Sequence, residues 1–460
     1  MRAVFIACFN AGFSFKALVF VVGILTDEKK TKDTSASKLA LEKYLDTDFT
    51  AIGQFAHKHL IKCLYSYFTQ YELKPVFELN SVLKALEYVL KFTLKSRSLF
   101  KSKSQLKDDV EFKNLLRDWL GQLYVMMENS KPAFLGPQTI AIQAISASFN
   151  TLYTAFSTHE MAEIAALFLG KIKYFEDKKL LNIQKLLFLH AMASSDLFKH
   201  VDVRNSLLPG VVKQLRLHIN SRAVEERNEV IKVLQRLLET VELQRWNGLD
   251  QGNVAEFIPT ITELQQLLLN TKFDNEERGL CDTLIVLFVI YHLMEPEQFS
   301  ELINKMTPSQ QVEYITSTLK LLGGIVAQEF PSFPENWFSL IMFQSSVVLK
   351  VFILLGHSVE QRMPRINDEL EMWSSYFKAN LSFVNCAALN LESFPEAKRK
   401  MILARYGDMR RDALDVLEVI WNGLDVHQFI FVEQMVVPII ELMLVSTRTH
   451  VTNTYSTSPR

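Results

Sequence analysis

The chain has 460 residues, enough for about two to four ordinary domains or one extended array, because single cores seldom grow beyond roughly 250–300 residues. Its 50 basic and 51 acidic residues leave a net charge of -1, which gives no overall electrostatic attraction for nucleic acid or an anionic membrane. Hydrophobic residues make up 48% of the chain, which disfavours a disordered protein. Glycine and proline are scarce, at 15 and 13 residues, which favours long helices.

The first residues form an apolar stretch that has two interpretations. Met1 and Arg2 precede an apolar run over residues 3–25, as in a signal peptide or a membrane-spanning helix. Asn10, Ser14 and Lys16 interrupt the run, and a lysine in the middle of a span costs about 2.5–3.5 kcal/mol on insertion scales. We therefore expect a buried helix here and no transmembrane segment.

Apolar residues recur along the chain at the three- and four-residue spacing of amphipathic helices. The segments 138–156, 160–175, 180–193, 207–219, 226–243, 280–294 and 337–355 follow helical patterns as well. In chain order, the clearest stripes are Leu83, Leu86, Leu90, Leu94; Phe112, Leu116, Trp119, Leu123; Phe257, Ile261, Leu264, Leu268; Val312, Ile315, Leu319, Leu322, Val326; Ile366, Leu370, Trp373, Phe377, Leu381; and Leu414, Leu417, Trp421, Leu424.

Short polar breaks, such as residues 129–138 and 295–309, separate these segments and would join antiparallel neighbours. The pattern predicts an all-α fold, an ARM/HEAT-like helical solenoid of stacked antiparallel helix pairs. No repeat of about 40 residues is visible in the sequence, so the prediction rests on architecture and not on self-similarity. Residues 446–460 are rich in serine and threonine, and we expect them to be disordered.

Motifs for catalysis, cofactors or metals are missing from the sequence. Gly323-Gly324 is the only glycine pair, and neither a phosphate-binding loop nor an HExxH or GxSxG motif occurs. His59 and Cys63 could supply half of a zinc site, but no second pair has ligand spacing. The sequence therefore predicts no catalytic residue, no cofactor and no metal.

The four cysteines also carry no recognisable chemistry. They lie scattered in apolar runs and form no CxxC pair, which is typical of reduced thiols in a cytosolic protein. These residues are Cys8, Cys63, Cys281 and Cys386.

A basic run is the strongest local charge feature. Lys95, Arg97, Lys101 and Lys103 could make a weak contact with anionic headgroups or an acidic partner, at about 1 kcal/mol per residue near a membrane surface. Such a contact would be a transient association with the membrane surface. The alternative is a solvated helix end, which we favour because acidic residues at 108, 109 and 111 offset the charge.

Four blocks of sequence resemble one family. Residues 391–411 include LESF, AKRKMIL and RYGDMRR; the others are ALVFVVGILTD at 17–27, LKALEYVLKF at 83–92 with SRSLF at 96–100, and VEQMVVPIIELML at 432–444 after Trp421. Their order and spacing are similar to the dedicator of cytokinesis (DOCK) family, in its Rac-directed, ELMO-associated branch. The resemblance covers about residues 14–444 and implies a central helical scaffold over 1–445, truncated on its N-terminal side, followed by a non-family tail at 446–460.

The resemblance also implies a function. Family members carry an SH3 region, a lipid-binding first homology region, this scaffold, and a second homology region that opens the nucleotide site of Rac. We expect a non-catalytic scaffold segment of a guanine-nucleotide exchange factor, without the exchange region, whose parent contacts Rac-type GTPases and ELMO and moves from the cytoplasm to the plasma membrane. The alternative is a stand-alone helical-repeat adaptor that binds a peptide or helix on its concave face.

The motif residues have physical roles that can be expected without the family. Gly407 should adopt a left-handed conformation at a helix end, and Asp408 should cap the next helix. Arg410 and Arg411 would then oppose the helix dipole and need an acidic partner, in this chain or on another domain or subunit. Tyr406 and Met409 complete the motif. Trp421 is expected in the core, covered by Met435, Val436, Ile439 and Leu442.

Overall fold

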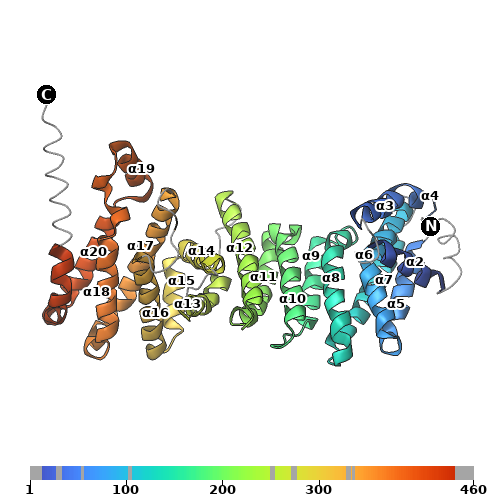
Figure 1. Cartoon of the computed structure of the whole chain (residues 1–460), viewed down its shortest axis with the longest axis horizontal. Coiled ribbons are helices and arrows are strands. Elements are labelled where there is room, and N and C mark those ends of the chain that lie inside the picture. The colour runs from blue at the N-terminus through green and yellow to red at the C-terminus, as the bar shows by residue number, and fades with distance from the viewer. Residues whose placement is uncertain are drawn as a thin grey trace. The chain divides into compact units, whose positions relative to one another are not determined.

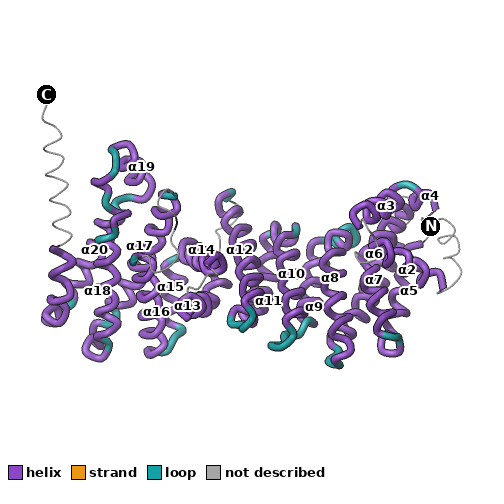
Figure 2. Tube along the Cα trace, viewed as in Figure 1, coloured by secondary structure: helices purple, strands orange, loops and turns teal. Residues whose placement is uncertain are grey.

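The computed structural model describes residues 13–26, 34–52, 56–101, 106–248, 254–270, 277–327, 333 and 337–440. Within these ranges all regular elements are helices and no residue forms a strand (Figure 2). The chain divides into two compact units, Met1–Thr240 and Val241–Arg460, which are described separately below. The predicted all-α solenoid of stacked helix pairs is confirmed.

The first unit packs its longer helices in two rows (Figure 1). One row contains α5, α7, α9 and α11, and the other contains α2, α6, α8 and α10. From α5 to α11 each helix contacts its neighbour but one in the chain, while α2 contacts α6 directly. This is the arrangement of stacked helix hairpins. The helices are α2 (Phe13–Thr26), α3 (Thr34–Asp46), α4 (Asp48–Ile52), α5 (Ala56–Thr69), α6 (Val76–Lys101), α7 (Leu106–Glu128), α8 (Leu135–Leu152), α9 (Thr158–Lys171), α10 (Lys179–Ser194), α11 (Val201–Ile219) and α12 (Val224–Trp246).

The second unit repeats this scheme. Contacts link α13, α16 and α18 in one row and α14, α17 and α20 in the other, while α18 also contacts α20. A further helix covers residues 428–440. The other helices are α13 (Ile261–Asn270), α14 (Glu277–Leu293), α15 (Pro296–Asn304), α16 (Pro308–Val326), α17 (Phe338–Glu360), α18 (Leu370–Val384), α19 (Glu396–Tyr406) and α20 (Met409–Gly423), with short 3-10 turns between them.

Local sequence signals set several helix starts. Ser157 and Glu160 form a capping box at α9: each side chain bonds the backbone N–H of the other residue. Thr307 and Gln310 do the same at α16, where Pro308 occupies the first helical position. Such boxes satisfy N–H groups that the helix itself leaves without acceptors.

Most predicted stripes lie in the core. The stripes that begin at Leu83 and Phe112 are buried along their whole length, and Trp119 is fully buried. Two stripes begin before their helices: Phe257 lies in the 3-10 turn Ala255–Thr260, which contains Pro259, and Ile366 lies in the 3-10 turn Met363–Asp368. The predicted break at 295–309 contains the short helix α15, whose start is marked by Pro296.

Polar side chains from neighbouring segments bond the free carbonyls at several helix C-termini. The Nε2 of Gln138 donates to the carbonyl oxygens of Met126 and Met127 at 3.0 and 3.2 Å, at the end of α7. The Nζ of Lys350 donates to the carbonyl of His292, near the end of α14, at 2.7 Å. These bonds satisfy the last carbonyls of each helix, which have no partner within it, and tie adjacent helices together.

Among the described residues one helix, α17, is long and apolar enough to cross a membrane, judged by length and composition alone. Two bent helix pairs pass the same test, so the number of candidate spans is up to three if each pair is taken as a single span. In the structure α17 packs against α14, α15, α19 and α20.

Candidate functional site

The motif around Gly407 forms the turn between α19 and α20. Gly407 has φ 71° and ψ -167°, a region that residues with a side chain rarely adopt, and its N–H donates to the carbonyl of Leu403 at 3.1 Å. The expected positive φ is thus found, although ψ lies outside the left-handed helical region. Glycine is required here by the backbone.

Asp408 caps α20, as expected, because its Oδ1 accepts from the backbone N–H of Arg411 at 3.2 Å. The side chain of Arg410 bonds a helix end: its Nε donates to the carbonyl of Val384, the last residue of α18, at 2.9 Å. Burial lowers the pKa of Arg410 and the nearby Asp408 and Glu392 oppose that shift. Arg410 therefore finds both a helix C-terminus and acidic neighbours within this chain, while Arg411 is exposed.

Trp421 is half-buried and not a core residue. Its ring meets the ring of Phe377 edge-on, with centroids 5.9 Å apart. The buried line of α20 runs through Met409, Ala413, Leu417 and Ile420, so it shares Leu417 with the predicted stripe but passes through Ala413 and Ile420 where the stripe has Leu414 and Trp421. Of the expected covering residues, Met435 is buried, Val436 is 44% exposed, Ile439 is half-buried and Leu442 lies outside the described residues.

Tyr406 is half-buried at the end of α19, with the guanidinium of Arg405 5.4 Å from its ring centroid. Met409 is buried and Tyr406 half-buried, so both residues pack at the turn and have a structural role there.

The structure does not bring the basic run together as one exposed surface. Arg97 is 4% exposed, pairs with Asp109 at 3.1 Å, and lies over the rings of Phe100 and Phe112 at 5.5 and 5.4 Å. It therefore belongs to the interior, which corrects the expected surface role of this residue. Lys95 is half-buried and pairs with Asp46 at 2.8 Å.

The two remaining members of the run cannot be placed in the same way. The side chain of Lys101 and the whole of Lys103 lie outside the described residues, as do residues 446–460. The role of these two lysines and the disorder of the tail stay predictions.

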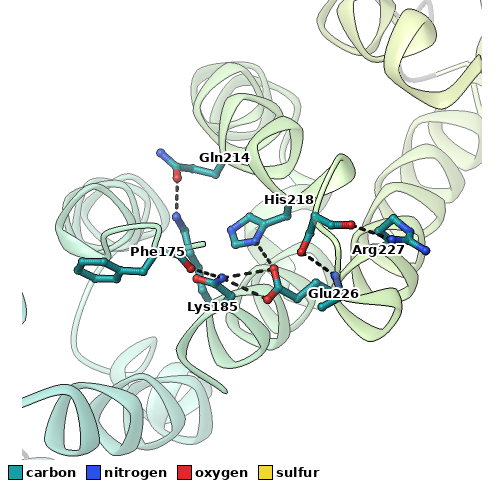
Figure 3. Close-up of polar contacts among 9 residues, drawn as sticks. Phe175, Lys185, Gln214, His218, Glu226 and Arg227 are labelled. Atoms are coloured by element: carbon teal, nitrogen blue, oxygen red, sulfur yellow. Dashed lines mark hydrogen bonds and ion pairs between the residues drawn. The ribbon is translucent and has the colours of Figure 1, made fainter. Parts of the chain in front are cut away.

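A polar cluster that the sequence did not single out lies buried among α10, α11 and α12 (Figure 3). The Nδ1 of His218 lies 3.3 Å from Oε2 of Glu226. Asn182 donates from Nδ2 to both oxygens of that carboxylate, at 3.2 and 3.3 Å, and to the carbonyl of Phe175 at 2.7 Å. The Nζ of Lys185 donates to Oε1 of Gln214 at 2.6 Å.

Burial governs the protonation of this cluster. It lowers the pKa of His218 to about 4, and the positive charge of Lys185 acts in the same direction against the attraction of Glu226. Burial also lowers the pKa of Lys185 to about 8. At neutral pH the imidazole is neutral and can donate from Nδ1 to Glu226, so the carboxylate accepts bonds from two helices.

The cluster joins helices and has no access to a substrate. Its central side chains, those of Asn182, Lys185, His218 and Glu226, are at most 1% exposed. Although a base, an acid and an amine lie together, no solute can reach them without opening of the packed helices. The arrangement is that of an internal polar link between α10, α11 and α12.

The cluster could have been noticed in the sequence from polar residues inside an apolar face. Asn182 and Lys185 alternate with Leu181, Leu186 and Leu189 in α10, at positions where helical spacing demands burial. A buried lysine needs a partner, but its identity depends on which helices become neighbours.

No group of three or more His, Cys, Asp or Glu side chains that could hold a metal occurs in the part of the chain that the structure describes. Of the two residues with partial ligand spacing, Cys63 is half-buried, and burial raises the pKa of its thiol, which makes the thiolate form less available to a metal.

The two rows of stacked helices within each unit are the arrangement of a helical-repeat protein, a class that offers extended surfaces for binding. A family model described as the "Dedicator of cytokinesis (DOCK) TPR region" matches residues 10–454. The chain belongs to this family, so the resemblance of the sequence blocks is confirmed.

Two named relatives share this region at low identity. Dedicator of cytokinesis protein 4 of Mus musculus and of Homo sapiens is 23% identical over 453 residues, which is 94% of this chain and 22% of the relative. Dedicator of cytokinesis protein 3 of Mus musculus has the same identity and coverage. The chain thus spans about a fifth of the length of these relatives.

Proposed function

We propose that this chain is a non-catalytic scaffold segment of a guanine-nucleotide exchange factor for Rac-type GTPases, in the branch of the family that works with ELMO. The observation that carries the proposal is the family match over residues 10–454. In the whole protein, the segment would hold a membrane-binding region and an exchange region in a fixed relation. The whole protein would act in the cytoplasm and move to the plasma membrane.

The packing of each unit supports a spacer role. Each helix inside a row contacts the helix before it and the helix after it in that row. Polar bonds to helix ends oppose sliding of one helix along the next. The side chain of Glu160 illustrates this, because it accepts from Lys113 and Arg117 of α7 at 2.9 and 2.5 Å while it caps α9. Burial raises the pKa of Glu160, but the hydrogen bonds from Ser157 and Lys113 and the charge of Lys113 outweigh it and lower this pKa to about 2.

The first test measures release of fluorescent GDP from a Rac-type GTPase with a substoichiometric amount of the purified chain. We expect no acceleration, while EDTA, which removes the nucleotide-bound Mg²⁺, should release the nucleotide in the same assay. Catalytic acceleration by the chain would contradict the proposal.

The second test uses a longer protein that contains this segment and an exchange region. Replacing the segment with a flexible Gly/Ser linker of equal residue number should leave exchange in solution unchanged and reduce activation of membrane-bound Rac. Loss of exchange in solution would mean that the segment takes part in the reaction. Unchanged activation at the membrane would exclude a spacer role.

The alternative is a stand-alone helical-repeat adaptor that binds a peptide or helix. The exposed apolar side chains at helix ends, such as Phe77 at 70% and Phe429 at 84%, are the observation in its favour. If the chain is an adaptor, it should bind its peptide and keep its function without any exchange region.

The expected absence of a transmembrane segment is part of the same proposal. The contacts of α17 with four other helices support it. Partition of the purified chain between buffer and vesicles tests it, and stable insertion of α17 would contradict it.

A further inference from the structure

A groove lies between α2, α5 and α6 in the first unit. Phe20 of α2 and Phe77 of α6 line it, and they are 66% and 70% exposed. Gly23 also lines it, and apart from its chain neighbours and the backbone of its own helix no atom lies within 4 Å of the position that a Cβ would take. Val19, Ile24 and Val82 make the rest of its apolar lining.

The groove contains a buried hydroxyl that has no partner. Tyr67 lines the groove and is 7% exposed, and its hydroxyl makes no hydrogen bond. Burial raises the pKa of Tyr67 to about 12, and the charge of Glu78 adds to this shift. Because buried hydroxyls in folded proteins are nearly always bonded, a ligand that brings a carbonyl or carboxylate oxygen would satisfy this one.

Positive charge prevails around the groove. Lys16 and Lys84 line it, and the Nζ of Lys74 lies 5.7 Å from the ring centroid of Tyr67. Glu78 is the acidic residue of the lining, and it pairs with Lys16 at 3.2 Å. The lining therefore has two lysines and one carboxylate, and since Glu78 pairs with Lys16, the charge of Lys84 is left over, with Lys74 close to Tyr67. This excess of positive charge favours an acidic ligand.

We propose that this groove docks an amphipathic helical segment of a partner protein, with apolar anchors between Phe20 and Phe77 and acidic residues toward the lysines. The volume of the groove, about 270 Å³, is smaller than the roughly 300–1,000 Å³ of small-molecule sites and suits anchoring side chains of a peptide. Recognition of an amphipathic helix by an apolar groove is a recurring mode of peptide binding. The inference does not depend on the exchange-factor function.

The probes are fluorescent synthetic helices of about 15 residues, with leucine or phenylalanine at helical spacing and glutamate elsewhere, compared with the same peptides carrying lysine for glutamate. Fluorescence anisotropy with the full chain should show at least tenfold tighter binding of the acidic set. If no acidic helix binds, or if the acidic and basic sets bind equally, the proposal is wrong.

The most direct variant is Gly23→Leu, which places a leucine side chain in the groove at a position of its own lining. The site has room for the added side chain, and α2 gains helix propensity, so the fold should survive. Binding of the acidic helices should fall at least tenfold. Gly170→Leu in α9, where an added Cβ also meets no atom, is the matched control and should bind normally.

Two more variants test the polar part. Lys84→Glu should weaken binding at least tenfold and reduce the preference for acidic probes. Tyr67→Phe should weaken binding several-fold without loss of thermal stability, since its hydroxyl bonds nothing in the free chain. Normal binding by both variants would overturn the proposed polar recognition.

Two other occupants would also overturn the proposal. Concentration-dependent self-association that Gly23→Leu abolishes, in sedimentation experiments, would identify a second copy of the chain. Binding to phosphatidylserine vesicles that the same variant abolishes, with no binding of the peptides, would identify a lipid surface.

Discussion

Acid should destabilise the first unit through His218. The fully buried imidazole has its pKa lowered from 6.5 to about 4, so the folded state resists a proton that the unfolded chain accepts. For a base with a depressed pKa, stability is fully present above the unfolded value and is lost as pH falls from about 6.5 toward 4. The shift corresponds to a loss on the order of 3 kcal/mol over this window.

Other charges near His218 do not remove this dependence of stability on pH. Lys185 has its pKa lowered to about 8, so it stays protonated in both states throughout the window and contributes no change there. Lys185 also repels an imidazolium, whereas Glu226 attracts it. Lys185→Met should therefore raise the pKa of His218 and make the slope smaller.

The assay is urea denaturation from pH 7.5 to 4, with His218→Gln as the comparison. Glutamine can still donate to Glu226 but has no titrating group, so subtraction removes the contributions of other acids common to both proteins. The difference should grow in favour of the variant as pH falls. Equal pH dependence of the two proteins, or an NMR titration of the His218 ring near 6.5, would refute the argument.

Three further predictions concern the second unit. Gly407→Ala should cost about 1–3 kcal/mol, because its φ of 71° and ψ of -167° suit glycine alone, and chemical denaturation against Gly170→Ala as control measures this. Trp421→Ala should cost less than Trp373→Ala, about 2 against about 3–5 kcal/mol, because Trp421 is half-buried and Trp373 fully buried; equal losses in denaturation would contradict the packing. Arg362→Met should cost about 3–5 kcal/mol, because it leaves the carboxylate of Glu369, bonded twice by Arg362, buried without its cation; hydrogen exchange that stays slow in α18 would argue against this.

Helical periodicity predicted the helices well where the apolar stripe was regular. The stripes that begin at Leu83 and Phe112 are buried as expected, since their spacing alone determines which face is apolar. The turn at Gly407 and the cap at Asp408 were also predictable, because both depend only on residues close to them in sequence.

Side chains whose partners come from other helices were not predictable. Arg97 points inward because Asp109 and Phe112 of α7 meet it there. The sequence showed that nearby acidic residues offset the basic run, but not that Arg97 would be buried with one of them. Trp421 lies at the margin of its face because the buried line of α20 follows Ala413 and Ile420, a rotation that only the packing of α18 and α17 decides. The cluster around His218 combines residues from three helices, so periodicity could mark Lys185 as out of place but not name its partners.

The polar bonds at helix ends explain how a chain without visible repeats can stack in a defined order. Leucine stripes of neighbouring helices resemble one another, so apolar contacts alone discriminate weakly between packings in which one helix is shifted along the next. A bond such as that from Arg410 to the carbonyl of Val384, or from Lys350 to that of His292, exists at one relative position only. Arg410 and Lys350 are half-buried, so a shifted packing would leave a partly desolvated cation without its acceptor. Each such bond therefore disfavours shifted packings, while apolar burial supplies the stability.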